Sequence, residues 1–208
     1  MRALILVDVQ NDFLPGGALG VPEGDAVVPV ANRLMKAFPL VVATQDWHPA
    51  DHGSFAANHP GRNVGELIDL SGLPQILWPT HCVQGTPGAE LAPGLDRAGI
   101  HHVVRKGTDP AIDSYSGFFD NGHRKATGLA DYLLAKGVNE VFVMGLATDY
   151  CVKFTALDAL RRLGFTTCLV ADGSRGVNLK PGDVADAVAE MEANKVRVVN
   201  SYELPWER

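Results

Sequence analysis

The stretch Val141-Phe142-Val143-Met144-Gly145-Leu146-Ala147-Thr148-Asp149-Tyr150-Cys151-Val152-Lys153-Phe154 decides the fold, because an apolar run stops at Gly145 and continues as a helical pattern. We expect a strand over 140–144 and a helix over 148–163. A strand that turns tightly into a helix leaves the first helical N–H groups without partners, and these groups attract an anion. Cys151 lies in the first helical turn, where a thiol is biased towards the nucleophilic thiolate. Taken alone, such a cysteine is more often a small buried side chain, so its role depends on the rest of the chain.

Outward from this corner, short apolar runs predict five further strands, at 3–7, 40–44, 102–105, 165–171 and 196–199. Helical periodicity separates them, at 25–38, 124–136 and 183–194. Asp25 is expected to cap the first of these helices, and Gly137 to close the second. The alternation of strand and helix predicts an α/β fold: three layers, with a six-stranded parallel sheet, helices on both faces and right-handed crossovers.

The long connection over 49–93 is dense in Gly, Pro, His and Asn and carries only a weak helical or mixed pattern. A connection of this length is usually functional. Nothing between the periodic segments resembles a linker, so we expect one domain over 1–208.

Composition narrows the class of protein. The formal net charge of -6 and a pI near 5.6 provide no basic surface, which argues against nucleic acid and anionic membranes as partners. Three cysteines without CxxC spacing argue against a disulfide framework and a structural zinc cluster, and indicate a reducing compartment. The N-terminus lacks a signal-peptide pattern and no apolar run reaches about 18 residues. We therefore expect a soluble, cytoplasmic protein.

Three residues that can perform nucleophilic chemistry lie at or just past predicted strand ends: Asp8, Lys106 and Cys151. In a doubly wound sheet, ligands bind outside the carboxyl ends of the strands. The three residues would supply an acid/base, a cation and a nucleophile, and the N–H groups near Ala147 and Cys151 would stabilise an oxyanion. The predicted chemistry is acyl transfer to cysteine followed by hydrolysis. Cys168 falls inside a predicted strand and is expected to be core.

A second group of polar residues follows the strand over 40–44. In an extended segment, residues i and i+2 project to the same side, so Asp46 and His48 can bind one ion together. His81 is the best third ligand, because the long connection returns it towards this strand end. Such a set fits a catalytic divalent metal, with zinc, iron and manganese all admissible. His52 and His59 lie in the same connection, and each is left open as a further ligand or a supporting polar residue.

Aromatic residues surround the same strand ends. Phe13, Trp78 and Tyr115 could line a pocket for a flat aromatic ring, with ordinary packing at the rim as the even alternative. His101 and His102 open a strand on the opposite edge of the sheet, and we interpret them as structural.

Four ordered blocks resemble the signature of nicotinamidase/pyrazinamidase, a branch of the isochorismatase-like cysteine hydrolases. They are Asp8-Val9-Gln10-Asn11-Asp12-Phe13, Asp46-Trp47-His48-Pro49-Ala50-Asp51-His52-Gly53-Ser54-Phe55, Trp78-Pro79-Thr80-His81-Cys82-Val83 and Gly145-Leu146-Ala147-Thr148-Asp149-Tyr150-Cys151-Val152. Four blocks in the correct order are more specific than any single motif.

The resemblance implies a sheet in the order 3-2-1-4-5-6 and the hydrolysis of nicotinamide to nicotinate and ammonia in NAD salvage, with pyrazinamide as a further substrate. It implies one divalent metal, with zinc favoured over iron or manganese, that receives the ring nitrogen of the substrate. It also implies a cis peptide at Leu146–Ala147. By position, the implied residues are the triad Asp8, Lys106 and Cys151, the oxyanion hole Ala147 and Cys151, and the metal ligands Asp46, His48 and His81, with His52 left open.

Other functions compete with this one. Relatives that hydrolyse ureido or carbamoyl amides keep the cysteine triad but need no Asp/His/His ion. A dinucleotide-binding module would need a glycine-rich phosphate loop after the first strand, where this chain has carboxylates. A non-catalytic interaction protein on the same fold is disfavoured by the intact triad. A small-molecule substrate is thus the expected partner, and a homo-oligomer is left open.

Overall fold

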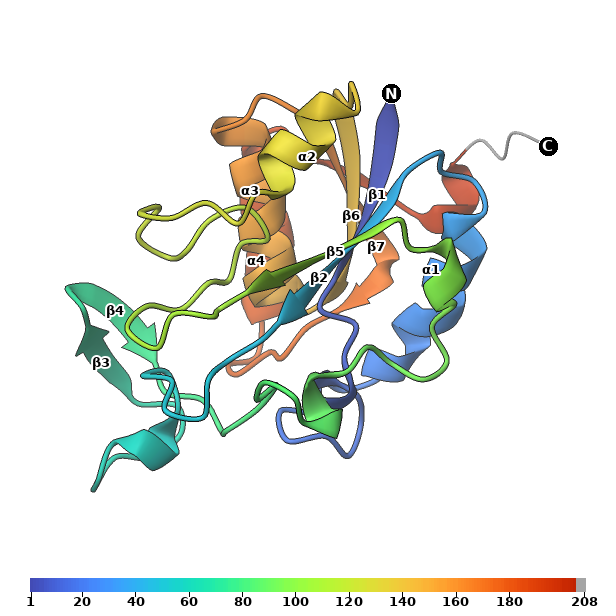
Figure 1. Cartoon of the computed structure of the whole chain (residues 1–208). Helices are drawn as coiled ribbons and strands as arrows, with labels where there is room; N and C mark the ends of the chain where they lie inside the picture. Colours follow the sequence, from blue (N-terminus) through green and yellow to red (C-terminus); the bar gives the residue numbers. More distant parts are fainter. Residues whose placement is uncertain (205–208) are drawn as a thin grey trace.

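The computed structural model describes residues 1–204, and its central feature is a six-stranded parallel sheet in the order β5-β2-β1-β6-β7-β8 (Figure 1). The strands are β1 (Arg2–Val7), β2 (Val41–Asp46), β5 (His102–Lys106), β6 (Glu140–Leu146), β7 (Thr166–Arg175) and β8 (Arg197–Val199). Counted along the chain within this sheet, the order is the expected 3-2-1-4-5-6. The labels differ because a separate hairpin, β3 and β4, comes between β2 and β5. The last four residues of the expected domain lie outside the described part of the chain.

Helices cover both faces of the sheet (Figure 1). Successive residues of β1 point to opposite faces, so Leu4 and Leu6 pack on the side of α1 (Val27–Met35). Ala3, Ile5 and Val7 belong to the core on the other side, which contains residues of α2 (Leu129–Ala135), α3 (Lys153–Arg161) and α4 (Asp183–Ala193). Burial on both faces explains why these strands are continuous apolar runs.

Two predicted helices are shorter than expected. A 3-10 turn over Gly24–Ala26 precedes α1, and Asp25 lies inside this turn instead of capping the helix. The helix expected from residue 124 begins only at Leu129. The segment before it is a loop because the Asp120 carboxylate accepts the backbone N–H groups of Arg124 and Lys125.

The long connection over 49–93 contains an antiparallel hairpin that the sequence pattern did not predict. Its strands are β3 (Leu67–Leu70) and β4 (Leu73–Ile76), joined through Ser71 and Gly72, which both have positive φ. Pro74 and the mixed burial of both strands hide the usual strand pattern. The weak helical expectation for this region is limited to short 3-10 turns at Ala56–Asn58 and Pro87–Ala89.

The corner after β6 brings the chain into the site. Gly145 has φ +123, and a Cβ atom there would lie 2.2 Å from the Val7 carbonyl oxygen, so only glycine fits. The Leu146–Ala147 peptide is cis, as the resemblance implied. The expected helix begins here as a π-helical turn over Thr148–Val152 and continues as α3. Among the described residues, no helix is long and apolar enough to cross a membrane.

Candidate active site

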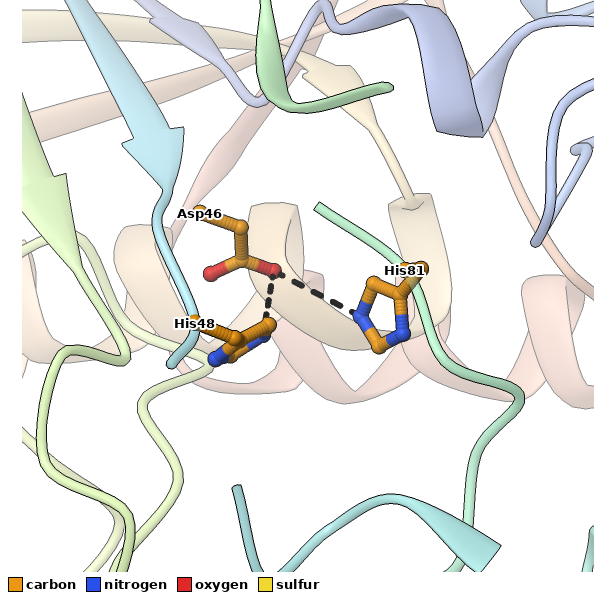
Figure 2. A group of neighbouring side chains, drawn as sticks. All are labelled: Asp46, His48 and His81. Carbon is orange, nitrogen blue, oxygen red and sulfur yellow. Dashed lines mark ion pairs between the residues drawn. The ribbon is translucent and has the colours of Figure 1, made fainter. Parts of the chain in front are cut away.

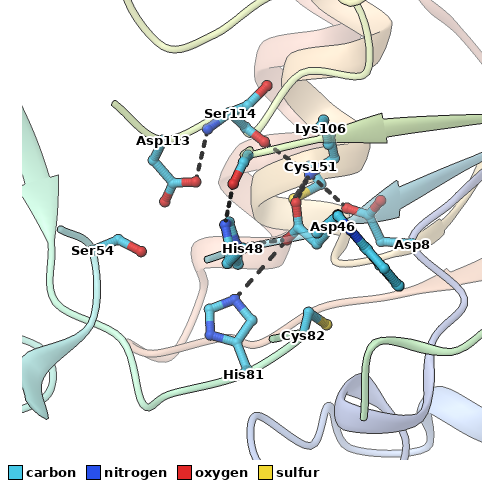
Figure 3. Close-up of polar contacts among 12 residues, drawn as sticks. Asp8, Asp46, His48, Ser54, His81, Cys82, Lys106, Asp113, Ser114 and Cys151 are labelled. Carbon is cyan, nitrogen blue, oxygen red and sulfur yellow. Dashed lines mark hydrogen bonds and ion pairs between the residues drawn. The ribbon is translucent and has the colours of Figure 1, made fainter. Parts of the chain in front are cut away.

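The three residues expected to perform the chemistry meet at the carboxyl ends of β1, β5 and β6 (Figure 3). Asp8 follows β1, Lys106 ends β5, and Cys151 lies in the π-helical turn after β6. Lys106 Nζ lies 2.8 Å from Asp8 Oδ2 and 3.5 Å from Cys151 Sγ. All three side chains are buried. The topology therefore brings these residues together in one cluster around a single ammonium group.

Lys106 is held by two further oxygen atoms. Its Nζ donates to Asp46 Oδ1 at 2.6 Å and to the carbonyl oxygen of Ser114 at 2.8 Å. Burial alone would lower the pKa of Lys106, but the carboxylates of Asp46 and Asp8 raise it well above its usual value. Lys106 is thus a permanent cation at neutral pH, fixed between two carboxylates and a thiol.

Asp8 is set up to exchange a proton near neutral pH. Burial raises the pKa of Asp8 to about 6, although Lys106 opposes the shift. Thr44 Oγ1 donates a 2.6 Å hydrogen bond to Asp8 Oδ1, and this bond fixes the orientation of the carboxylate. At pH 7 Asp8 is therefore ionised, and its pKa is close enough to neutral pH for it to accept a proton and return it.

The pKa of the Cys151 thiol is shifted in the direction opposite to the one that the sequence led us to expect. We expected the corner to favour a thiolate, but burial raises the pKa of Cys151 well above its usual value, and the charge of Lys106 only partly offsets this. The first turn is π-helical and buried, so the local environment penalises the anion before a substrate is present. The resting group is a thiol beside a carboxylate, and the proton has to be transferred when the sulfur attacks.

Asp46, His48 and His81 form a second cluster whose ligand atoms all lie within 4.8 Å of one another (Figure 2). Asp46 Oδ2 lies 3.4 Å from His48 Nε2 and 4.0 Å from His81 Nε2. His48 Nδ1 contacts the Gly107 carbonyl oxygen at 2.8 Å and His81 Nδ1 contacts that of Pro79 at 2.7 Å, so both Nδ1 atoms carry the proton. The Nε2 atoms then face the carboxylate, as they do in metal sites.

The protonation of the two histidines agrees with a cation-binding cluster. Burial lowers the pKa of His81 to about 4, so this ring is neutral at pH 7, the form that binds a metal. Burial also opposes protonation of His48, but the Asp46 carboxylate raises the pKa of this ring. Asp46 thus attracts positive charge to the position that a divalent ion would share. One carboxylate and two oriented imidazoles fit such an ion.

His52 is buried beside this cluster but is oriented differently. Its Nδ1 accepts the backbone N–H of Ser54 at 3.2 Å and lies 2.8 Å from Ser54 Oγ, so its proton is on Nε2. That Nε2 has no hydrogen-bond partner within residues 1–204, and one nitrogen of the ring lies within 4.8 Å of ligand atoms of His48 and Asp113. His59 contacts the Gly53 carbonyl oxygen at 2.7 Å instead.

Phe13, Trp78 and Tyr115 line one narrow cavity of about 30 Å³, together with His81 and Cys151. This placement favours the pocket interpretation over rim packing. Trp78 Nε1 donates to Tyr115 Oη at 3.1 Å, which fixes the two rings relative to each other. A larger groove of about 570 Å³ between the hairpin and α4 shares Tyr115 with this cavity, but its lining includes none of the triad.

Several residues of the site carried no recognisable signal of their own. Asp113 and Tyr150 also line the narrow cavity: Asp113 comes from a loop without a strand end to mark it, and Tyr150 from the π-helical turn Thr148–Val152, inside the fourth sequence block. Gln10 is buried, and its side-chain amide donates to the Asp46 carbonyl oxygen at 2.9 Å and accepts the Asp46 N–H at 2.8 Å. It therefore continues the pairing of β1 with β2 beyond the last residue of β1. Its place in the first sequence block was the signal that could have identified it.

A model of the isochorismatase domain matches residues 2–201. The chain belongs to the isochorismatase family. Within that family, the nicotinamidase of Escherichia coli is 55% identical over 196 residues, covering 92% of this chain and 91% of that protein. These findings place the chain in the nicotinamidase branch of the family.

Solved structures of the isochorismatase family agree with this placement. A nicotinamidase/pyrazinamidase of Acinetobacter baumanii superimposes with a TM-score of 0.94 at 45% identity and covers 98% of each chain. The pyrazinamidase of Pyrococcus horikoshii in complex with zinc has a TM-score of 0.78 at 41% identity and covers 96% of this chain and 98% of its own.

His101 and His102, which we expected to be structural, lie at the opposite strand ends, where His101 Nδ1 accepts the Val41 N–H and His102 stacks on Tyr132.

Proposed function

We propose that this protein is a nicotinamidase, an amidohydrolase that converts nicotinamide and water to nicotinate and ammonia in NAD salvage. The observation that carries the proposal is the shared Asp46 carboxylate, which joins a cysteine centre to an Asp/His/His cluster. A cysteine centre alone would suit many amides. The second cluster adds a means to select an amide attached to a ring with a basic nitrogen. The similarity to the nicotinamidase of Escherichia coli supports the same substrate.

The first half of the reaction uses the cysteine centre. Cys151 Sγ attacks the amide carbonyl carbon, and its proton passes to Asp8, which has a pKa of about 6 and is therefore ionised at pH 7. Lys106, 3.5 Å from the sulfur, stabilises the negative charge that develops there. Asp8 then returns the proton to the leaving nitrogen, so that ammonia departs and a thioester remains on Cys151.

The second half releases the acid. Asp8 takes a proton from water, the water oxygen attacks the thioester carbonyl, and the sulfur leaves with its proton restored. In both halves the carbonyl oxygen becomes an oxyanion. We assign its stabilisation to the backbone N–H groups of Ala147 and Cys151, because both residues line the cavity beside the thiol.

Asp46, His48 and His81 would hold the divalent ion, and their donor set fits it. When bound, the ion supplies a Lewis-acid anchor for the ring nitrogen of the substrate. Zinc is favoured because the related pyrazinamidase of Pyrococcus horikoshii was solved with zinc, and iron or manganese would suit the same donors. We assign His52 to the surroundings of the ion as a hydrogen-bond donor through its unpartnered Nε2.

The aromatic side chains Phe13, Trp78 and Tyr115 would bind the two faces and the edge of the ring. Their cavity of about 30 Å³ has room for only one or two water molecules. Substrate must therefore displace side chains of the wall as it enters. Pyrazinamide has a ring of the same size, so we expect it to be a second substrate. The three cysteines are free and buried in the described chain, which accords with the predicted cytoplasmic location.

The test is ammonia release from nicotinamide by purified protein, with metal analysis of the same sample. We expect stoichiometric nicotinate and ammonia and about one divalent ion per chain. Release of ammonia only from a carbamoyl amide, with no dependence on metal, would show that the alternative substrate class is correct.

A further inference from the structure

We infer that Asp12 is a positioning residue for the metal-binding loop: its carboxylate sets the place of His81 relative to Asp46 and His48. The inference rests on the proposed function, because it concerns the ion that these three side chains would hold. Asp12 lies in the 3-10 turn Asn11–Phe13 after β1 and belongs to none of the groups assigned a chemical step.

The contact runs through the residue after His81. Asp12 Oδ2 accepts the backbone N–H of Cys82 at 2.7 Å, and Oδ1 accepts that of Ala18 at 3.3 Å. A hydrogen bond to an ionised acceptor is roughly twice as strong as a neutral one. Cys82 has φ +46, a conformation that residues other than glycine adopt only where their surroundings hold them. The Asp12 carboxylate thus binds the N–H group of Cys82, a residue whose backbone conformation is strained.

The other side of the same residue is tied to the metal cluster. The Cys82 carbonyl oxygen accepts the His48 N–H at 3.0 Å, and the His48 carbonyl oxygen accepts the Gln84 N–H at 2.9 Å. Cys82 is therefore held between the Asp12 carboxylate and the backbone of His48. His81 directly precedes Cys82. The bond from the Cys82 N–H to Asp12 and the bond from the His48 N–H to the Cys82 carbonyl oxygen therefore together determine the distance between His81 and His48.

Packing leaves the carboxylate a single position. A Cβ atom at Gly88 would lie 2.1 Å from Asp12 Oδ2, so the backbone of the turn Pro87–Ala89 lies directly against it. Asn11 Nδ2 donates to the Pro87 carbonyl oxygen of the same turn at 2.7 Å, a bond that does not involve the Asp12 carboxylate. A methyl group at Gly88 would displace the carboxylate without removing it.

The 3-10 turn Asn11–Phe13, which holds Asp12, also carries Phe13, whose ring centre lies 5.5 Å from that of His81. One segment after β1 therefore supports the histidine from two directions, by a hydrogen bond to its neighbour and by a ring contact. A purely structural role for Asp12 would affect the stability of the fold. A positioning role affects the affinity for the ion in protein that remains folded.

The experiment compares metal-stripped wild type with Asp12→Ala, Asp12→Asn and Gly88→Ala, and uses Asn11→Ala as the matched control from the same turn. Zinc affinity is measured by competition with a chromogenic chelator, and folding by circular dichroism and thermal unfolding. The alkylation rate of Cys151 with iodoacetamide reports on the cysteine centre without metal. We expect Asp12→Ala and Gly88→Ala to bind zinc about 10- to 100-fold more weakly, with alkylation unchanged. Asp12→Asn keeps one acceptor oxygen and should lose less, and Asn11→Ala should match wild type.

The outcomes separate this inference from the proposed function. Wild type that binds no divalent ion overturns the metal part of the proposed function, and the inference with it. Wild type that binds zinc while folded Asp12→Ala binds it equally well overturns the inference alone. If Asp12→Ala does not fold, unchanged zinc affinity in both Gly88→Ala and Asp12→Asn overturns it, as does an alkylation rate that changes as much as the zinc affinity.

Discussion

Lys106 and Asp46 form a buried ion pair of 2.6 Å that connects the cysteine centre to the metal-binding side chains. The second oxygen of Asp46 lies 3.4 Å from His48 Nε2, so one carboxylate faces both an ammonium group and the metal cluster. Burial raises the pKa of Asp46, but Lys106 and His48 outweigh it and hold the pKa well below its usual range. Because this carboxylate is shared, changes on one side of it alter the electrostatics of the other.

Replacing the nucleophile should abolish turnover and leave the fold intact. We expect Cys151→Ala to reduce ammonia release from nicotinamide by at least about 10³-fold, because no other group can form the thioester. The matched control is Cys168→Ala, a buried cysteine that contacts Arg197 and lies away from the site. It should lose some thermal stability and keep its kcat. Retained turnover in Cys151→Ala would refute the assignment.

Removing the shared cation should destabilise the protein. Lys106→Met leaves the buried Asp8 and Asp46 facing each other without a counter-charge, which typically costs about 3–5 kcal/mol in the free energy of unfolding. Adding Asp46→Asn removes one of the two charges and should restore part of that loss. Chemical denaturation of the single and double variants measures both effects. Equal stability of Lys106→Met and wild type would contradict the ion-pair arrangement.

The pH profile should report Asp8. Its pKa is raised from 3.8 to about 6 by burial, so the carboxylate is ionised above that value and protonated below it. Protonated Asp8 cannot accept the thiol proton, and kcat/KM should therefore fall about tenfold for each pH unit below about 6. Measuring kcat/KM from about pH 5 to about pH 8 tests this. A profile that stays flat across the acid range would show that Asp8 is not the base.

Metal removal should act mainly on substrate binding. Stripping the ion with a chelator, or His48→Ala, removes the anchor for the ring nitrogen, so we expect the KM for nicotinamide to rise more than kcat falls. Restoring zinc should reverse the effect in stripped wild type but not in His48→Ala. An unchanged kcat/KM after complete stripping would refute the metal assignment.

His52 and His59 provide a matched pair for the surroundings of the ion. If His52 acts as a donor through Nε2, His52→Ala should still bind one zinc ion, with a smaller loss of affinity than His48→Ala. His59→Ala, which loses only a contact to the Gly53 carbonyl oxygen, should bind zinc as wild type does. Zinc titration followed by metal analysis measures the three variants together. A loss in His52→Ala as large as in His48→Ala would identify His52 as a ligand.

The central sheet could be predicted because its strands are apolar on both faces and its helices are periodic. The converging strand ends followed from that pattern, and the order of the strands from the resemblance that the four sequence blocks carry. The hairpin β3–β4 could not be predicted, since Pro74 and solvent exposure of Leu67 remove the alternation that marks a strand. The loop before α2 was also missed, because Asp120 binds backbone groups that a helical pattern would have used.

The clustering of the site residues was predictable, but their protonation was not. Strand ends placed Asp8, Lys106 and Cys151 close together, yet the direction of the thiol pKa depends on burial, which the sequence does not state. Asp113 reaches the cavity from a loop with no periodic signal. Gln10 required knowledge of which backbone lies opposite it. These features depend on distances between segments remote in sequence.

β1 lies at the centre of the sheet, with β2 on one side and β6 on the other. The residues that meet in the site at the end of β1 are remote from one another along the chain: Lys106 is 60 residues from Asp46 and 45 residues from Cys151. The site runs from Asp8 to Cys151, so no continuous half of the polypeptide contains all of it. Non-local pairing of this kind forms late and slowly during folding. Recovery of ammonia release after dilution from denaturant is therefore a measure of how much of the whole chain has reached its final topology.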